Sequence, residues 1–152
     1  MKQTAPLPTL TGQNNIKTTK AMTKEDAEGI LSARRLLNEN QKTAVAVEAA
    51  EEIKKALENG IAAFWFEKTD GTLRHALGTR NAAIIEQWKE MNLDDDERVA
   101  DLNNQRNTFR RRNASETSFF DLEARNKTTG EIQPAWRSFV SERAIGIDES
   151  YC

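Results

Sequence analysis

The segment that decides the fold is residues 61–80, IAAFWFEKTDGTLRHALGTR. The side chains near both of its ends alternate in character with a period of two, which is the pattern of a β-strand rather than a helix. The Asp-Gly pair at 70–71 lies between them, and this pair is among the strongest short signals for a tight hairpin turn. In the first strand Phe64 and Phe66 share one face and Trp65 lies on the other. The segment therefore predicts an antiparallel β-hairpin.

The chain beyond this hairpin contains one more helix and several further strands. The stretch NAAIIEQWKEM has apolar residues at helical spacing and starts at Asn81, a favoured N-cap residue. The strand-like stretches that follow are TSFFDLEA (117–124), AWRSFV (135–140) and the shorter RAIGI (143–147). Short antiparallel strands with one inserted helix predict a small barrel or a curled sheet. We place this domain at residues 60–147.

Residues 92–116, NLDDDERVADLNNQRNTFRRRNASE, separate this helix from the next strand. They show little periodicity, and their charge changes from acidic at the start to basic at the end. We expect a long exposed loop, which inside a compact domain is often functional or disordered. Its FRRR run contains Arg111 and Arg112, which either contact an anionic ligand or belong to an ordinary solvated charge run.

The N-terminal part of the chain has a helical pattern. Thr23 is a good N-cap for a first helix, and the residues from Lys42 to Glu58 form a second helix with an apolar stripe. Gly60 is expected to end this second helix in the left-handed conformation. We expect residues 23–59 to form a helical hairpin that packs on itself, on the barrel or on a second copy of the chain.

The two ends of the chain lack these patterns. Residues 1–22 contain two prolines, three lysines and no acidic residue, so we expect a flexible basic arm. Residues 148–152 are interpreted as a short tail. The start of the chain has no apolar signal-peptide core, and no window is apolar enough to span a bilayer. These features favour a soluble cytoplasmic protein without a membrane partner.

The composition limits the possible functions. A net charge of −2 gives no global field that would attract nucleic acid, so an anion site requires local clustering of cations. The single cysteine, Cys152, cannot form an internal disulfide or a multi-thiolate metal site, which fits a reducing compartment. His75 is the only histidine, so we expect no metal and no cofactor. Because we recognise no acid–base pair, nucleophile motif or phosphate-binding glycine loop, we expect no enzyme activity.

Two arginines of the hairpin segment are candidate ligands for an anion. Arg74 lies on the strand face opposite Leu73 and His75, and Arg80 follows the Gly-Thr pair that ends the strand. At one rim of a small barrel, both would present planar donors to a phosphate or a carboxylate. From spacing alone, the commoner interpretation is that both are ordinary exposed charges.

A third arginine lies in the WRSF stretch. Arg137 stands between two aromatic residues, Trp136 and Phe139, and on the face opposite Trp136. Aromatic side chains beside an arginine form a stacking platform for a nucleic-acid base. The alternative is that Trp136 and Phe139 pack in the core and that Arg137 points outwards.

The order of the motifs is more specific than any one of them. FWFEKTDGTLRHALGTRN (64–81) is followed by a helix, by a basic RRRN segment, by FFDLEA and by WRSF. This order resembles the WYL-like Sm/SH3-type small β-barrel domain family of phage and mobile-element proteins, over roughly residues 60–147. The Asp-Gly hairpin and the Trp-Arg-Ser-Phe strand carry most of the resemblance.

The resemblance implies an α+β fold class, in which the N-terminal helical hairpin precedes a five-stranded SH3-like antiparallel β-barrel with one inserted helix. It also implies a groove lined by basic residues that binds a nucleotide or a nucleic acid. The positions that match the family's motifs are Lys68, Arg74, Arg80 and Arg137, with Arg111 or Arg112 on the basic loop.

Two functional hypotheses follow. The first is a non-enzymatic, phage-encoded binding module that recognises a nucleotide or a nucleic acid through the basic groove, in the host cytoplasm. The alternative is an interaction protein that binds a host protein or self-assembles through the helical hairpin, with the barrel as scaffold. A homo-oligomer is expected because the apolar residues of the hairpin exceed what two short helices hide by pairing. These residues are Leu31, Leu37, Val45, Ile53 and Leu57.

Overall fold

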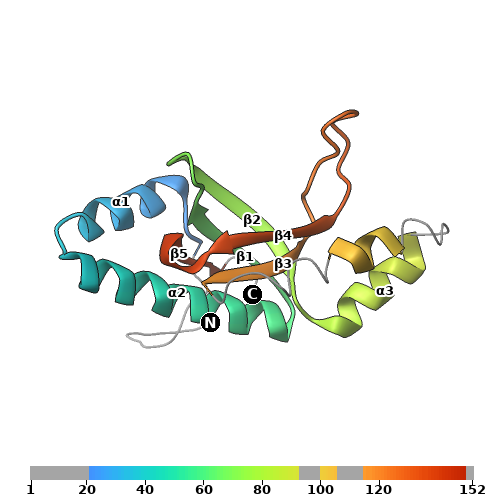
Figure 1. The fold of residues 1–152 in the computed structure, drawn as a ribbon, viewed down its shortest axis with the longest axis horizontal. Coiled ribbons are helices and arrows are strands. Elements are labelled where there is room, and N and C mark those ends of the chain that lie inside the picture. Colours follow the sequence, from blue (N-terminus) through green and yellow to red (C-terminus); the bar gives the residue numbers. More distant parts are fainter. Residues whose placement is uncertain (1–20, 93–99, 106–114, 150–152) are drawn as a thin grey trace, which may run out of the picture.

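The computed structural model describes residues 21–92, 100–105 and 115–149. Figure 1 shows two helices followed by an antiparallel sheet, with a third helix between its second and third strands. The elements are α1 (Lys24–Arg34), α2 (Glu39–Asn59), β1 (Ile61–Glu67), β2 (Leu73–Thr79), α3 (Ala82–Asn92), β3 (Glu116–Asp121), β4 (Ala135–Val140), the 3-10 helix η1 (Ser141–Arg143) and β5 (Ala144–Asp148). The predicted α+β class, with helices before a five-stranded antiparallel sheet, is confirmed.

The β1–β2 hairpin forms where the Asp-Gly pair predicted it. The Lys68 N–H donates to the Thr72 carbonyl at 2.8 Å, which leaves a three-residue loop between them. Asp70 accepts hydrogen bonds from the backbone N–H and the hydroxyl of Thr72, at 3.0 and 2.6 Å. Gly71 has a φ of 88°, the left-handed conformation that such a loop requires at its last residue.

The sheet has the strand order β4-β3-β2-β1-β5, and every pair is antiparallel. Phe64 pairs with Ala76, and Phe66 pairs with Arg74. Phe64 and Ala76 are fully buried, so this face of the hairpin points into the core. Arg74 therefore extends from the core-facing side of β2, close to the hairpin loop.

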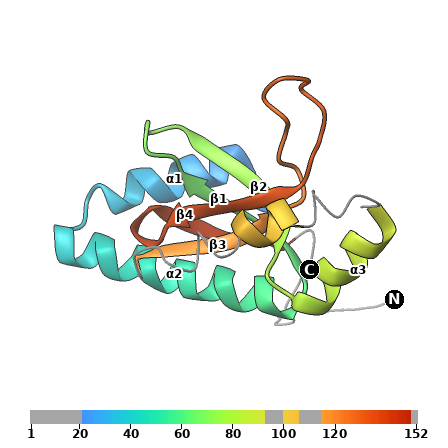
Figure 2. The same cartoon turned by 45° about the vertical axis from the view of Figure 1, so that its right-hand side comes forward.

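The core lies between the sheet and α2, which runs along one side of the sheet in both Figure 1 and Figure 2. Phe64, Phe119 and Phe139 pack together from three different strands. Ile53 and Leu57 of α2 are fully buried against them, and each such side chain stabilises the fold by about 1.5–3 kcal/mol. Of the packing alternatives left open by the sequence, α2 thus packs on the barrel.

A second, smaller cluster joins α3 to the other side of the sheet. Ile85, Leu102, Phe120 and Trp136 are its buried members. Leu102 belongs to residues 100–105, which are helical and lie beside α3. The expected irregular loop over 92–116 is therefore wrong for this part, because a single buried leucine and the Lys89–Asn103 hydrogen bond of 3.0 Å hold the short helix in place.

The helix ends show how far local signals reach. Thr23 and Asn81 cap α1 and α3 as predicted. The Asp26 N–H donates to the Thr23 hydroxyl oxygen, and the Ile84 N–H donates to the Asn81 amide oxygen, each at 3.1 Å. Helix α2 starts at Glu39, three residues before the predicted Lys42, because Asn38 forms a capping box with Gln41. Gly60 is extended, with φ 171°, and not left-handed as predicted.

Strand β2 includes both Gly78 and Thr79, the pair that the sequence had placed at its end. A Cβ at Gly78 would stand 2.6 Å from the Phe120 carbonyl oxygen, so the close approach of β3 requires glycine here. Strand β5 likewise includes Asp148, which the sequence had assigned to the tail. Residues 1–20 of the predicted basic arm and residues 150–152 of the predicted tail lie outside the described residues. Within the described ranges, no helix is both long enough and apolar enough to cross a membrane.

Candidate functional site

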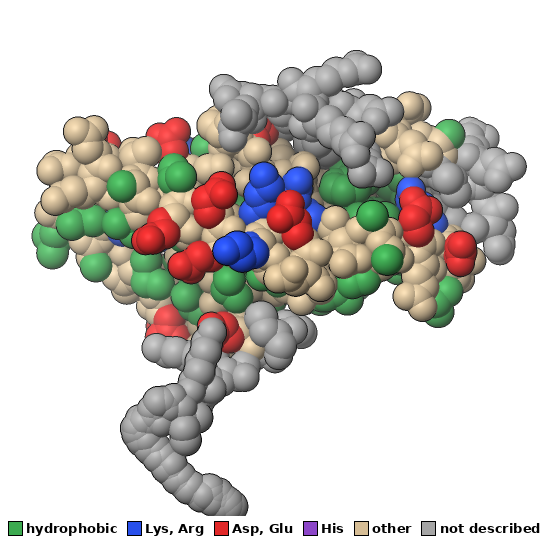
Figure 3. Space-filling model, turned by 90° about the horizontal axis from the view of Figure 1, so that it is seen from below, with side chains coloured by type: hydrophobic (Ala, Val, Ile, Leu, Met, Phe, Trp, Pro, Cys, Tyr) green, Lys and Arg blue, Asp and Glu red, His purple; other side chains and the backbone are tan. Residues whose placement is uncertain are grey.

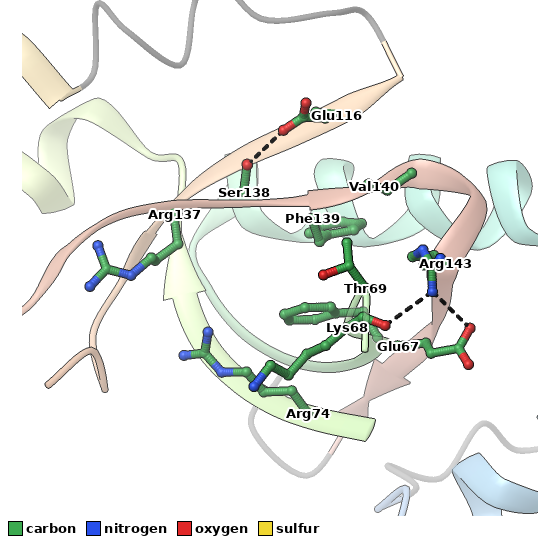
Figure 4. A pocket seen from close by; sticks show the side chains of 11 residues that line it. Glu67, Lys68, Thr69, Arg74, Glu116, Arg137, Ser138, Phe139, Val140 and Arg143 are labelled. Carbon is green, nitrogen blue, oxygen red and sulfur yellow. Dashed lines mark hydrogen bonds and ion pairs between the residues drawn. The ribbon is translucent and has the colours of Figure 1, made fainter. Parts of the chain in front are cut away.

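A cavity of about 400 Å³ lies beside the β1–β2 hairpin loop, between β2, β4 and η1 (Figure 4). We call it the basic pocket because four of its lining residues are cations and two are carboxylates. The cations are Lys68, Arg74, Arg137 and Arg143, and the carboxylates are Glu67 and Glu116. Phe66 and Phe139 supply an apolar part of its wall. Elements far apart in the sequence thus place charges around one cavity.

Arg74 is held by the core side of the barrel. Its guanidinium forms an ion pair with Asp121, whose side chain is fully buried, and lies 5.8 Å from the ring centre of Phe66. Asp121 also accepts a hydrogen bond from the Glu123 N–H at 2.9 Å. The Arg74 side chain is 31% exposed, so one side of it still faces the pocket. The positive charge of Arg74 mainly compensates the negative charge of the buried Asp121 carboxylate.

Lys68 and Arg137 differ from Arg74, because neither compensates a buried carboxylate among the described residues. Arg137 donates a hydrogen bond to the Trp136 carbonyl at 2.9 Å, and Lys68 is exposed on the hairpin loop. Neither forms an ion pair with a carboxylate among the residues that the structure describes. Figure 4 shows both side chains extending towards the same side of the cavity as Arg74.

Arg143 is a lining residue that the sequence analysis missed. It donates to the Lys68 carbonyl at 3.0 Å and lies 3.4 Å from a Glu67 carboxylate oxygen, which ties η1 to the hairpin loop. The sequence placed Arg143 at the start of a strand, and no local pattern marked it. On the opposite wall, Ser138 donates to Glu116 at 2.9 Å.

The structure does not bring Arg80 to the pocket. Six residue steps along an extended chain, or about 20 Å, separate its Cα from that of Arg74. Its guanidinium donates to the Ser118 carbonyl and hydroxyl at 2.5 and 3.0 Å, and its Nε lies 3.8 Å from Glu58. Arg80 therefore connects the start of α3 to β3 and α2.

Trp136 is not a stacking platform. It is 6% exposed, and its ring packs against Phe120 with 5.8 Å between ring centres. The core-packing alternative was correct, because the aromatic positions of β4 face the two clusters on either side of the sheet. The predicted contacts Arg111 and Arg112 lie outside the described residues.

Two further ionisable groups lie near the hairpin. The hydrogen bond from the Thr72 hydroxyl, then that from its backbone N–H, lowers the pKa of Asp70, and the charge of Lys68 acts in the same direction. Asp70 serves the turn, as the sequence indicated. His75 lies on the other face of β2, 2.9 Å from Asp148 and against Trp65, and does not line the basic pocket.

The chain as a whole carries a net charge of −2, yet this pocket gathers four cations against two carboxylates. Two of the cations are engaged with Asp121 and Glu67, so Lys68 and Arg137 are the groups with most capacity for a ligand. An arginine fork and a lysine ammonium are side chains whose chemistry suits an anionic group such as a phosphate.

Comparison with known proteins agrees with this fold. Residues 50–144 match the model of the WYL_2 family, which is described as an Sm-like SH3 beta-barrel fold. Searches of curated proteins and of solved structures found no match. The match begins inside α2, ten residues before the predicted domain start, at the part of this helix that packs into the barrel core. With more than half of its length matched, the chain belongs to the WYL_2 family of Sm-like SH3 β-barrel domains.

Proposed function

We propose that this protein is a non-enzymatic binding module that holds a phosphate-bearing ligand, a nucleotide or a nucleic acid, in the basic pocket. The observation that carries the proposal is the placement of Lys68 and Arg137. They come from the hairpin loop and from β4, extend towards the same side of one cavity, and have no carboxylate partner among the described residues.

The size of the cavity favours a small phosphate-bearing group. About 400 Å³ is within the range of small-molecule pockets, whereas a duplex needs a long basic surface. A free nucleotide, or one nucleotide of a single strand, therefore fits better than duplex DNA. The walls of Phe66 and Phe139 give the ligand an apolar contact.

The test removes the two pocket cations that form no ion pair with a described carboxylate. Lys68→Ala with Arg137→Ala is compared with Lys24→Ala with Lys55→Ala, which removes the same charge from exposed helix positions. Binding of labelled ATP, GTP, single-stranded DNA and single-stranded RNA is followed by fluorescence anisotropy. We expect the pocket variant to bind at least about tenfold more weakly than the control, because each charged hydrogen bond contributes about 1.5–3 kcal/mol. Equal binding by the two variants refutes the proposal.

The identity of the ligand requires a separate experiment. The protein is purified from expressing cells under low salt, denatured, and its extract is examined by mass spectrometry for nucleotides and nucleic-acid fragments. An extract free of both, from a protein that also binds none of the labelled ligands, argues against the whole proposal. Encoding by a phage and action in the host cytoplasm are parts of this proposal that rest on the family resemblance alone.

A second candidate function is an interaction protein that self-assembles or binds a host protein through the helical hairpin. Leu36, in the α1–α2 connection, is 88% exposed, and Val45 and Val47 of α2 are also exposed. Figure 3 shows exposed apolar side chains among acidic ones over this end of the molecule. Ile53 and Leu57, which the sequence analysis counted towards such a surface, are covered by the barrel. Light scattering of wild type and Leu36→Asp tests this candidate, and a monomeric wild type at high concentration opposes self-assembly.

A further inference from the structure

A second hollow of about 660 Å³ lies between α1 and β5, and it shares no lining residue with the basic pocket. We call it the acidic groove. Its floor is apolar and is formed by Met22, Ile30 and Ile145 with their neighbours. Its carboxylates are Glu25, Asp26, Glu52 and Glu149, and its lining in the described part of the chain contains no lysine or arginine. An anionic ligand would be repelled here, so the groove suits a cationic one.

The carboxylates of the groove differ in the contacts that they form within the protein. Asp26 accepts the Thr23 N–H in the capping box of α1. Glu25 and Glu52 are exposed, and neither forms an ion pair with a described residue. They come from two different helices and border the same apolar floor. A ligand with cations beside aliphatic groups is complementary to this arrangement.

The wall of the groove that β5 forms includes the edge of the sheet. Among the residues that the structure describes, β5 is the last strand of the sheet and pairs with β1 on one side only. On its other side, Arg34 of α1 donates to the carbonyls of Ala144 and Ile145, at 2.5 and 3.1 Å, and so covers the first part of the edge. Alternate residues of an antiparallel strand present their N–H and C=O to the same side. The register shift of β5 opposite Trp65 and Phe66 lets the neighbouring carbonyls of Ala144 and Ile145 both face the edge that Arg34 covers. Regular pairing resumes with Gly146 opposite Trp65, so Ile147 again faces this edge, one residue beyond Gly146 and past the two carbonyls that Arg34 contacts.

We propose that the acidic groove docks an extended cationic segment of a partner protein, which adds a strand to the edge of β5 at Ile147. In this arrangement the backbone of the segment continues the sheet, an aliphatic side chain rests on the apolar floor, and lysine or arginine side chains meet Glu25 and Glu52. Strand addition beside a helix is an established way for a domain to bind a peptide, with the ladder giving affinity and the flanking side chains giving specificity. The proposal does not depend on the function of the basic pocket.

The test starts from a random peptide library that is selected on the full-length protein. We expect the selected peptides to be enriched in lysine and arginine at positions that alternate with aliphatic residues. Selection of no peptide, or of acidic peptides, overturns the proposal. Selection only of sequences like residues 1–22 of this chain, which carry three lysines and no acid, also overturns it, in favour of the chain's own N-terminal segment as occupant.

The selected peptide is then measured against matched variants. Glu25→Gln with Glu52→Gln is compared with Glu90→Gln with Glu123→Gln, which removes two exposed carboxylates from other parts of the surface. We expect about tenfold weaker binding for the groove variant only, from two ion pairs of up to about 1 kcal/mol each. Equal binding by both variants places the peptide elsewhere and overturns the proposal.

A last measurement isolates the strand edge. Two versions of the selected peptide carry N-methyl groups on alternate amides, in the two possible phases. One phase blocks the amides that pair with β5 and the other leaves them free, so we expect one version to lose binding and the other to keep it. Retention of binding by both versions shows that no ladder forms at β5.

Discussion

The basic pocket and the acidic groove differ in how their charges are used. In the pocket, two of the four cations compensate carboxylates of the fold, Asp121 and Glu67, and the remaining two face the cavity. In the groove, Asp26 caps a helix, while neither Glu25 nor Glu52 forms an ion pair with a described residue. Each region thus combines charges that hold the fold with charges available for a ligand, and the two regions have opposite sign.

The largest expected effect is a difference in stability between two variants of the basic pocket, one that removes a cation paired with a buried carboxylate and one that removes a cation without such a partner. Arg74→Ala leaves the Asp121 carboxylate buried without its cation, so we expect a loss of about 3 kcal/mol in the free energy of unfolding. Lys68→Ala, on the exposed loop, is expected to change it by less than about 0.5 kcal/mol. Urea denaturation of both variants is the measurement. A loss below about 1 kcal/mol for Arg74→Ala contradicts the structural role of this residue.

The next largest effect concerns Arg34, a cation of α1 that holds β5 beside the acidic groove. Burial lowers the pKa of Arg34, and its guanidinium is held by the carbonyls of Ala144 and Ile145. Arg34→Met keeps the apolar contacts and removes both hydrogen bonds, for an expected loss of about 2 kcal/mol. Hydrogen exchange of β5 amides should accelerate relative to those of β1. Arg35→Met, at the exposed neighbouring position, is the control and should change neither quantity.

An element of the fold could be predicted from the sequence where the residues that cause it lie within a few positions of it. The hairpin, the bounds of β4 and the caps at Thr23 and Asn81 follow from turn chemistry, alternation and side-chain acceptors within a few residues. The helix over residues 100–105 was missed because its two apolar residues, Ala100 and Leu102, make no helical period. It depends on the burial of Leu102 in the cluster with Ile85 and Trp136 and on the Lys89–Asn103 hydrogen bond, which are contacts across the fold.

The candidate site was only partly predictable for the same reason. Alternation correctly separated Arg74 from Leu73 and Leu77, but it did not show that the face with Ala76 points into the core, since the leucines are the more apolar set. The pairing of Arg74 with Asp121 spans 47 residues and depends on the sheet order. Arg80 matched the motif as well as Arg74 did, yet strand length alone carries it away from the pocket.

A smaller expected effect tests whether the pocket binds phosphates of a strand. Binding of single-stranded DNA should weaken as salt rises, with a slope of log K against log salt of about −0.7 for each phosphate contact. Lys68→Ala with Arg137→Ala should reduce the slope by about 1.4. Glu25→Gln with Glu52→Gln should leave it unchanged, since the groove lies elsewhere. A slope that changes equally in both variants would mean that the two regions are not independent.

The smallest expected effect concerns Asp70, a carboxylate that serves a turn rather than either region. The hydrogen bonds from Thr72, that of its hydroxyl first and that of its backbone N–H second, hold the pKa of Asp70 below the ordinary aspartate value of 3.8. A lowered folded-state pKa means that this group contributes stability above the unfolded pKa and loses that contribution as the pH falls through the folded pKa.

Thr72→Val removes the hydroxyl donor and keeps the backbone donor, so the pKa of Asp70 should rise part of the way back. Carbon NMR titration of the Asp70 carboxyl measures both values, and the stability of wild type should fall more steeply than that of Thr72→Val below about pH 4. A wild-type midpoint at or above the ordinary aspartate value would show that the Thr72 hydroxyl does not organise the hairpin loop, and with it the position of Lys68 at the basic pocket.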